Sequence, residues 1–122
     1  MLVLADSKGR VKVPIRSNGS FLECFWIDNK LYLTPGLYRK LTTDEYLKVW
    51  EFQKKHRVKG MPYTIHCPLE KPGKKVRITI PKAVRVSDLW KFYETTLEIA
   101  GMKFQAYCLE PCKAVPLEKV VR

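Results

Sequence analysis

Turn-forming residues recur about every ten positions in the first third of the chain, and short runs of strand-forming residues lie between them. The turns are Asp6–Gly9, Ser17–Ser20 and Asp28–Lys30. The runs that they separate are residues 2–4, 11–15, 21–27 and 31–33. Strands joined by such short turns pair with their neighbours along the chain, so residues 1–34 are predicted to form an antiparallel meander.

The residues after this meander carry the signals of a helix start. Thr42 and Glu45 have the spacing of a capping box, in which each side chain binds the backbone N–H of the other residue. Leu41 and Tyr46 have the spacing of a hydrophobic staple. We therefore predict a helix over residues 43–57 that lies on the sheet through one apolar stripe.

Two further elements are predicted in the second half of the chain. Tyr63–Leu69 and Lys75–Ile80 alternate apolar and polar residues and flank the turn Glu70–Lys74, which indicates a second hairpin. Apolar residues then recur at helical spacing up to Ala100, after Ser87, a good N-cap residue. This pattern predicts a second helix.

A chain of 122 residues is long enough for one compact domain and too short for two domains and a linker. With a last strand at residues 102–109, the predicted fold class is α+β: an antiparallel sheet, made of the meander and the second hairpin, with two helices packed on one face. Residues 111–122 contain two prolines and several apolar side chains. They are predicted to be a strap over the core or an arm onto a second copy of the chain, in a homodimer.

Positive charge is concentrated in one segment. Of the 23 Lys and Arg residues, ten lie between positions 54 and 85, where Glu70 is the one acid, so this segment has a formal charge of +9 out of +11 for the chain. Clustered cations suit a polyanion, because each neutralised phosphate releases bound counterions. The candidate nucleic-acid-binding residues are Lys54, Lys55, Arg57, Lys59, Lys71, Lys74, Lys75, Arg77, Lys82 and Arg85.

Part of this charge is also compatible with a purely structural role. Cations in the last turn of a helix stabilise its dipole, and lysines on an exposed strand prevent the strands of two molecules from pairing. Each of these roles suits a few charges rather than ten. A second, smaller row of cations lies near the N-terminus, at Lys8, Arg10, Lys12 and Arg16. Only the tertiary fold decides whether this row joins the first.

The charge pattern favours a non-enzymatic nucleic-acid-binding protein that holds phosphates with the basic hairpin and the helix end. The alternative is a small virus-encoded or accessory protein whose basic surface meets an acidic protein. Exposed aromatic rings would favour single strands, because bases stack on them. Phe21, Phe25 and Trp50 occupy core positions of the predicted elements, so these rings are expected to be buried. The aromatic residues therefore do not establish single-stranded binding, and single- and double-stranded partners both stay open.

No catalytic, metal or cofactor signature of comparable strength is present. Cys108 and Cys112 lie four positions apart, whereas a structural zinc site needs two pairs of closely spaced ligands. Disulfides or buried thiols are therefore expected. His56 and His66 have no acid or nucleophile at a recognisable spacing. We expect no enzyme activity, no bound metal and no cofactor.

Two segments resemble part of the DNA-binding regulators of the AbrB type. Asp6–Pro14 and Arg77–Arg85 each look like the signature of a strand followed by proline and further basic residues in that family. Each match covers nine residues, and the short helix and Gly-Asp turn that follow in the family are missing after both. The resemblance implies DNA rather than RNA as the partner and assigns no residue a role.

The composition also bears on the source of the chain. The chain contains only two Asn and two Gln, whereas 29% of its residues are charged. This bias is expected of a thermophile. Met1–Ala5 are followed by Asp6 and Lys8 rather than by a long apolar stretch, so neither a signal peptide nor a membrane span is expected. We expect an intracellular, cytoplasmic protein of archaeal or viral origin.

Overall fold

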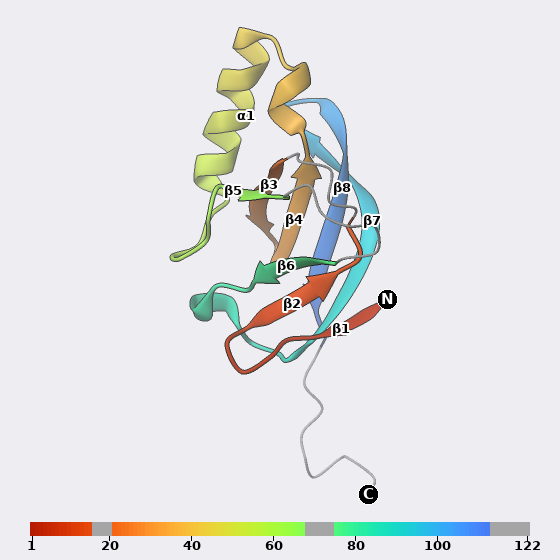
Figure 1. The fold of residues 1–122 in the computed structure, drawn as a ribbon. Coiled ribbons are helices and arrows are strands. Elements are labelled where there is room, and N and C mark those ends of the chain that lie inside the picture. Colours follow the sequence, from red (N-terminus) through yellow and green to blue (C-terminus); the bar gives the residue numbers. More distant parts are fainter. Residues whose placement is uncertain (16–20, 68–74, 113–122) are drawn as a thin grey trace, which may run out of the picture.

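The structure is a computed structural model that describes residues 1–15, 21–67 and 75–112 (Figure 1). The strands are β1 (Leu2–Leu4), β2 (Arg10–Val13), β3 (Phe21–Ile27), β4 (Lys30–Pro35), β5 (Thr64–His66), β6 (Val76–Thr79), β7 (Leu89–Ile99) and β8 (Met102–Pro111). The helical elements are α1 (Thr43–Lys55) and two short 3-10 turns, η1 (Leu37–Lys40) and η2 (Lys82–Val84).

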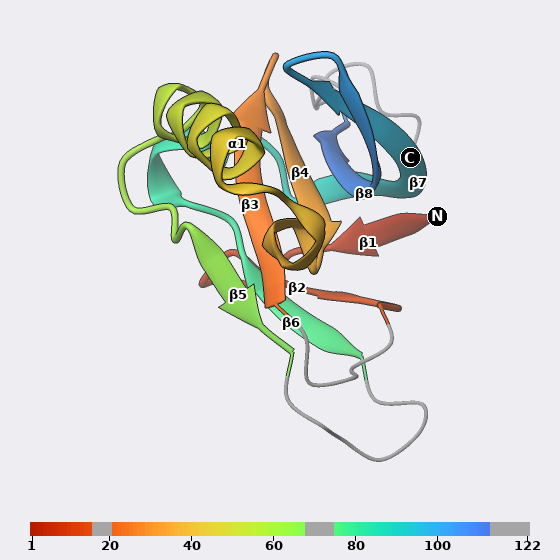
Figure 2. The ribbon, with the colours of Figure 1, turned by 90° about the horizontal axis from the view of Figure 1, so that it is seen from above.

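Six of the strands form one antiparallel sheet in the order β1-β7-β8-β4-β3-β5. The other two strands, β2 and β6, pair with each other and form a two-stranded unit, hereafter the β2–β6 ribbon. Figure 1 shows this ribbon crossing the long strands near one end of the molecule, with the β7–β8 turn near the other end. Figure 2 shows β7 and β8 on one side, β5 on the other, and β3 and β4 between them beside α1.

Buried apolar side chains form two clusters, one on each face of the central strand β3. The first cluster contains Val11 and Ile78 of the ribbon together with Cys24 of β3. The second contains Val49 of α1 together with Phe25, the residue after Cys24. Since neighbouring residues of a strand point to opposite faces, the ribbon covers one face of the sheet and α1 covers the other.

The predicted first helix is confirmed. Its N-cap Thr42 accepts a hydrogen bond from the backbone N–H of Glu45, and the Glu45 carboxylate accepts one from the backbone N–H of Thr42. These bonds satisfy N–H groups that have no partner within the helix. The helix ends at Lys55 rather than at residue 57, because His56 leaves helical backbone angles.

A buried amide joins this helix to the sheet. The Gln53 side chain donates hydrogen bonds to the carbonyl oxygens of Cys24 and Tyr63, at 3.0 and 2.7 Å. It also accepts a hydrogen bond from the Tyr38 hydroxyl at 2.6 Å. Every polar group of this fully buried side chain therefore has a partner, as burial of an amide requires.

The predicted meander is only partly present. β3 and β4 form the expected hairpin, and Asp28 and Asn29 in its turn have positive φ, which these two residue types tolerate well. The hairpin predicted between residues 2–4 and 11–15 is wrong, because β1 pairs with β7 and β2 pairs with β6. The turn at Asp6–Gly9 does form, but it passes the chain from the large sheet to the ribbon.

The second predicted hairpin is also wrong. β5 pairs with β3 at the edge of the large sheet, whereas β6 pairs with β2 in the ribbon. The alternation within β6 is confirmed, since Val76 and Ile78 are buried and Arg77 and Thr79 are exposed. Alternation reports which side of a strand is buried and does not report which strand lies beside it. The predicted turn at residues 70–74 lies outside the described residues.

The second predicted helix is wrong, because residues 89–99 form the long strand β7. Trp90 and Phe92 belong to the cluster on the ribbon side, whereas Leu97 and Ile99 belong to the cluster on the helix side. A strand that changes its buried face midway has apolar residues at mixed spacings, and those spacings resemble the period of a helix. The α+β class is confirmed, with one α-helix rather than two among the described residues.

β8 is the last strand that the structure describes. The predicted last strand is confirmed and continues to Pro111, and the backbone N–H of Cys112 donates to the carbonyl oxygen of Leu89 at 2.9 Å. The strap or arm predicted for the C-terminus lies, from residue 113 on, outside the described residues. Within the described ranges, no helix has both the length and the apolar character needed to cross a membrane.

Candidate nucleic-acid interface

The β2–β6 ribbon brings cations from two distant segments of the chain onto one surface. Antiparallel pairing places Lys12 opposite Arg77 and Arg10 opposite Thr79. Residues that lie directly opposite each other share a face, so these four side chains point outward while the apolar residues between them face the core. Arg10 and Lys12 of the smaller N-terminal row therefore share a face with Arg77 of the main row, which the sequence pattern left open.

The two strands of the ribbon repeat one short pattern. Arg10–Pro14 and Arg77–Pro81 both begin with arginine, end with proline and have apolar residues at the second and fourth positions. The register places the first residue of each segment opposite the third residue of the other, so the ribbon has approximate twofold symmetry. Both segments lie within the longer stretches Asp6–Pro14 and Arg77–Arg85. Their shared pattern is a signal in the sequence that could have suggested their pairing.

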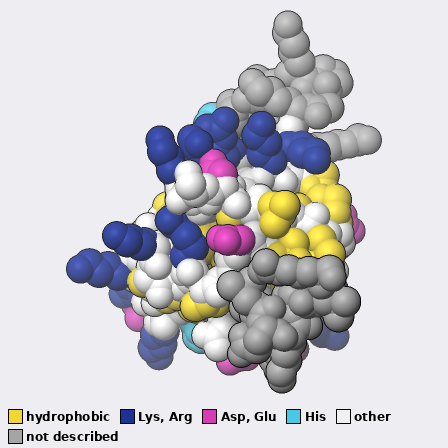
Figure 3. Space-filling model, turned by 90° about the horizontal axis from the view of Figure 1, so that it is seen from below, with side chains coloured by type: hydrophobic (Ala, Val, Ile, Leu, Met, Phe, Trp, Pro, Cys, Tyr) yellow, Lys and Arg dark blue, Asp and Glu magenta, His cyan; other side chains and the backbone are white. Residues whose placement is uncertain are grey.

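The outward face of the ribbon has little compensating negative charge. Neither β2 nor β6 contains an acidic residue. Asp6, in the turn before β2, lies 2.7 Å from the Arg10 Nε and accepts hydrogen bonds from the backbone N–H groups of Arg10 and Lys8. The hydrogen bond from the Arg10 N–H is the main cause that lowers the pKa of Asp6 to about 2. Figure 3, which views the molecule from below, shows Lys and Arg side chains mainly along two adjoining edges of this face, with a few acidic side chains among them.

A groove of about 450 Å³ continues this surface past the end of β6. One wall comes from the segment between α1 and β5, and the other from β6 and η2. Three of the predicted cations, Arg77, Lys82 and Arg85, line it. Arg85 donates a hydrogen bond to the carbonyl oxygen of Ile80 at 3.0 Å, and its guanidinium fills the space beside Gly9 in which a Cβ atom would lie.

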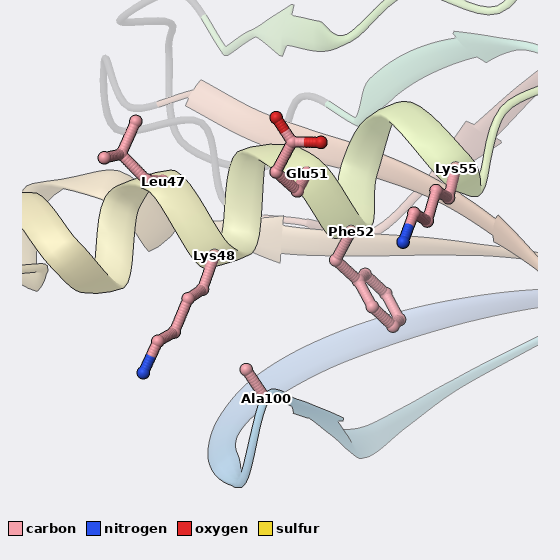
Figure 4. Close-up of a pocket in the computed structure, with 6 residues that line it drawn as sticks. All are labelled: Leu47, Lys48, Glu51, Phe52, Lys55 and Ala100. Atoms are coloured by element: carbon pink, nitrogen blue, oxygen red, sulfur yellow. The ribbon is translucent and has the colours of Figure 1, made fainter.

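The predicted cations near the end of α1 lie in different surroundings. Lys54 forms an ion pair with Glu51 at 2.8 Å and lies over the Trp50 ring. Lys55 lines a second groove, between α1 and the β7–β8 turn; Figure 4 shows its side chain on the same helix face as Phe52. These two lysines are therefore not part of the groove that Arg77 lines.

The remaining predicted cations also differ in their surroundings. Arg57 is half-buried, and its guanidinium lies 3.4 Å from the centre of the Tyr63 ring. It also donates a hydrogen bond to the carbonyl oxygen of Met61. These contacts hold the segment after α1 in place. Lys59 and Lys75 are exposed, and Lys75 directly precedes β6. The candidate residues Lys71 and Lys74 lie outside the described residues, as does Arg16 of the smaller row.

The aromatic side chains provide one exposed ring pair near the start of β3. The expectation that Phe21 is buried is wrong: it is 45% exposed, and its ring centre lies 5.0 Å from that of His66 on the neighbouring strand. Phe21 packs sideways against this edge strand rather than into the core. Phe25 is fully buried, as expected, and Trp50 is half-buried.

The cysteines are free thiols, and three of them, Cys24, Cys67 and Cys108, are buried. Burial raises the pKa of Cys24 to about 12, so this thiol stays protonated and unreactive at neutral pH. His56 lies with its Nδ1 2.9 Å from the carbonyl oxygen of Phe52. In the part of the chain that the structure describes, no three His, Cys, Asp or Glu residues are grouped so that they could hold a metal ion.

Comparison with protein-family models, curated proteins and solved structures finds no significant match to this chain.

Proposed function

We propose that this chain binds nucleic acid without catalysing a reaction on it, and that the outward face of the β2–β6 ribbon holds the phosphates. The register of the ribbon, with Lys12 directly opposite Arg77, is the observation that supports this most. Like charges in that position repel each other and destabilise the pair of strands. A phosphate chain bound across the two strands removes this repulsion, because each cation then faces a negative group.

The shape of the ribbon favours double-stranded DNA. The major groove of B-form DNA is wide enough to admit a two-stranded β-ribbon, whereas the major groove of an RNA duplex is deep and narrow. The ends of the strands carry further cations, with Lys75 before β6 and Lys82 after it. Contacts from Lys and Arg to phosphates position a protein on DNA and carry no sequence information, so we expect weak sequence preference.

The first experiment measures the affinity for duplex DNA, single-stranded DNA and duplex RNA by fluorescence anisotropy over a range of salt concentrations. Phosphate binding predicts that the logarithm of the affinity falls linearly with the logarithm of the salt concentration. Duplex DNA is expected to bind most tightly. Absence of binding to all three nucleic acids at low salt would refute the proposal and favour an acidic protein as the partner of the basic surface.

A charge-reversal variant then tests the ribbon itself. Lys12→Glu, Lys75→Glu and Arg77→Glu are combined, and the salt dependence for duplex DNA should become flatter by about 0.9 for each phosphate contact that is lost. The matched control combines Lys40→Glu, Lys48→Glu and Lys103→Glu, which are exposed residues outside the ribbon. Both variants change the net charge equally, so equal losses of affinity would mean that only total charge matters and that the ribbon is not the site.

A further inference from the structure

The groove beside the ribbon combines positive charge with an apolar wall. Arg77, Lys82 and Arg85 line it, and no acidic residue does so among the described residues. Pro62, Ile65 and Pro81 supply the apolar part of its lining. Its volume of about 450 Å³ falls in the range of sites that enclose a small molecule. A surface that met only the backbone of a duplex would need the cations and not the apolar wall.

Arg85 is held in place before any ligand arrives. Its Nη2 donates to the Ile80 carbonyl oxygen at 3.0 Å, and the guanidinium packs beside the backbone of Gly9, where a Cβ atom would come within 2.1 Å of the Arg85 Nε. The Nε–H is buried and has no acceptor among the described residues. The positive charge of this guanidinium attracts a phosphate placed in the groove. An arginine that is already ordered also loses less side-chain entropy on binding.

We propose that this groove binds one nucleotide of the nucleic acid, with its phosphate on Arg77, Lys82 and Arg85 and its base against Pro62, Ile65 and Pro81. This inference rests on the proposed nucleic-acid binding and specifies part of it. A base inside a continuous duplex is stacked and paired, so the nucleotide in the groove is an unpaired one, at a strand end or next to the duplex held by the ribbon. The protein is therefore expected to prefer a junction between double- and single-stranded DNA.

The test compares a blunt duplex with the same duplex carrying a short unpaired overhang, by anisotropy with the full chain. One base bound against an apolar wall should make the overhang duplex bind about tenfold more tightly. Lys82→Glu and, separately, Pro62→Glu should abolish this preference, because both change exposed residues that line the groove. The matched control is Lys40→Glu, which makes the same charge change as Lys82→Glu at an exposed residue outside the ribbon and the groove.

Three outcomes separate this inference from the proposed function. A preference for the overhang in the unchanged chain and in Lys40→Glu, lost in both groove variants, supports the groove as the nucleotide site. Equal affinity of the unchanged chain for the blunt and overhang duplexes overturns the proposed nucleotide site in the groove and leaves binding by the ribbon intact. A preference for the overhang that survives in Lys82→Glu and Pro62→Glu has the same consequence. Failure to bind either duplex overturns both proposals. Thermal unfolding of each variant verifies that it is folded.

Discussion

The two covers of the six-stranded sheet, α1 and the β2–β6 ribbon, differ in how they carry charge. α1 has three acidic residues and three lysines, and at least one of these lysines forms an ion pair within the helix. The ribbon strands carry two arginines and a lysine without any acid, although both covers bury aliphatic side chains against the sheet. Covering the core does not require unbalanced charge. The ribbon strands therefore carry more positive charge than packing against the sheet requires.

The two covers also differ in how they are assembled. α1 is one continuous segment that starts with its own capping box. The ribbon joins segments that are distant along the chain, since Lys12 of β2 and Arg77 of β6 lie side by side. Closing so long a loop loses conformational entropy before the contacts form, so the ribbon depends on the rest of the fold more than α1 does.

The largest expected effect is a loss of stability when a buried residue of the ribbon is truncated. This substitution tests whether the ribbon is part of the core or only an attached binding element. Ile78 is 1% exposed and faces the sheet. Ile78→Ala should lower the free energy of unfolding by about 2–5 kcal/mol, because it removes buried methyl groups and leaves a cavity. Chemical denaturation measures this loss, with the exposed neighbour Thr79→Ala as the control. A loss no greater than that of the control would show that the ribbon is not part of the core.

The next effect concerns the contact between the ribbon turn and Arg85. Gly9 has φ of 76°, so Gly9→Ala should lower the free energy of unfolding by about 1–2 kcal/mol through backbone strain. The free energy of unfolding of this variant should fall by about 1 kcal/mol more, because the Arg85 guanidinium must move away from the Ile80 carbonyl oxygen.

Gly60→Ala is the matched control for this contact, since Gly60 has φ of 86° and, apart from its chain neighbours, no described residue has an atom within 4 Å of the position of a Cβ. It reports the backbone strain alone. If chemical denaturation shows that Gly9→Ala and Gly60→Ala lower the free energy of unfolding equally, Arg85 is not held against Gly9, and the ordered arginine of the groove loses its support.

A smaller effect is expected at the β7–β8 turn, on the helix side of the molecule. Ala100 has φ of 51°, a left-handed conformation that alanine disfavours. Ala100→Gly should raise the free energy of unfolding by about 0.5–1 kcal/mol, because the relief of strain exceeds the added entropy of the unfolded chain. Asp28→Gly is the matched comparison, since Asp28 has φ of 50° but tolerates it through its short polar side chain. A gain at Asp28 equal to that at Ala100 would contradict this interpretation.

The smallest effect concerns Asp6, the acid next to the ribbon. Its pKa is lowered from 3.8 to about 2, so its ionised form stabilises the folded chain above pH 3.8, and this contribution is lost as the pH falls towards about 2. The stability of the unchanged chain should therefore exceed that of Asp6→Asn at about pH 5, and the difference should shrink between these two pKa values. Thermal unfolding over this pH range measures it, and a difference that does not depend on pH would mean that Arg10 and Asp6 do not interact.

Local signals predicted α1 and the β3–β4 hairpin, because their stabilising contacts lie within a few residues of one another. The capping box of Thr42 and Glu45 needs only residues of the first helical turn, and the turn at Asp28 and Asn29 joins two strands that are adjacent in the chain. The same reasoning was wrong for β7. Its neighbours on both faces come from distant segments, and the resulting mixed spacing resembles that of a helix.

The candidate site was predicted in part for the same reason. The outward position of Arg77 follows from alternation within β6, but the pairing of Arg77 with Lys12 does not. Arg57 belongs to the same run of cations in the sequence, yet its contacts with Tyr63 and Met61 give it a structural role. Gly9 could be recognised from the sequence as a turn residue, but not as the surface against which Arg85 packs.

By itself, the amino-acid sequence determined the class of the fold, the first helix, the buried side of β6 and the excess of positive charge, because these follow from the local order and chemistry of residues. The tertiary structure alone decided which strands are neighbours. That choice depends on how the whole chain buries its apolar surface, and alternation is equally compatible with many partners. It decided that Arg10 and Lys12 share one face with Arg77, and that a groove with an ordered Arg85 lies next to them.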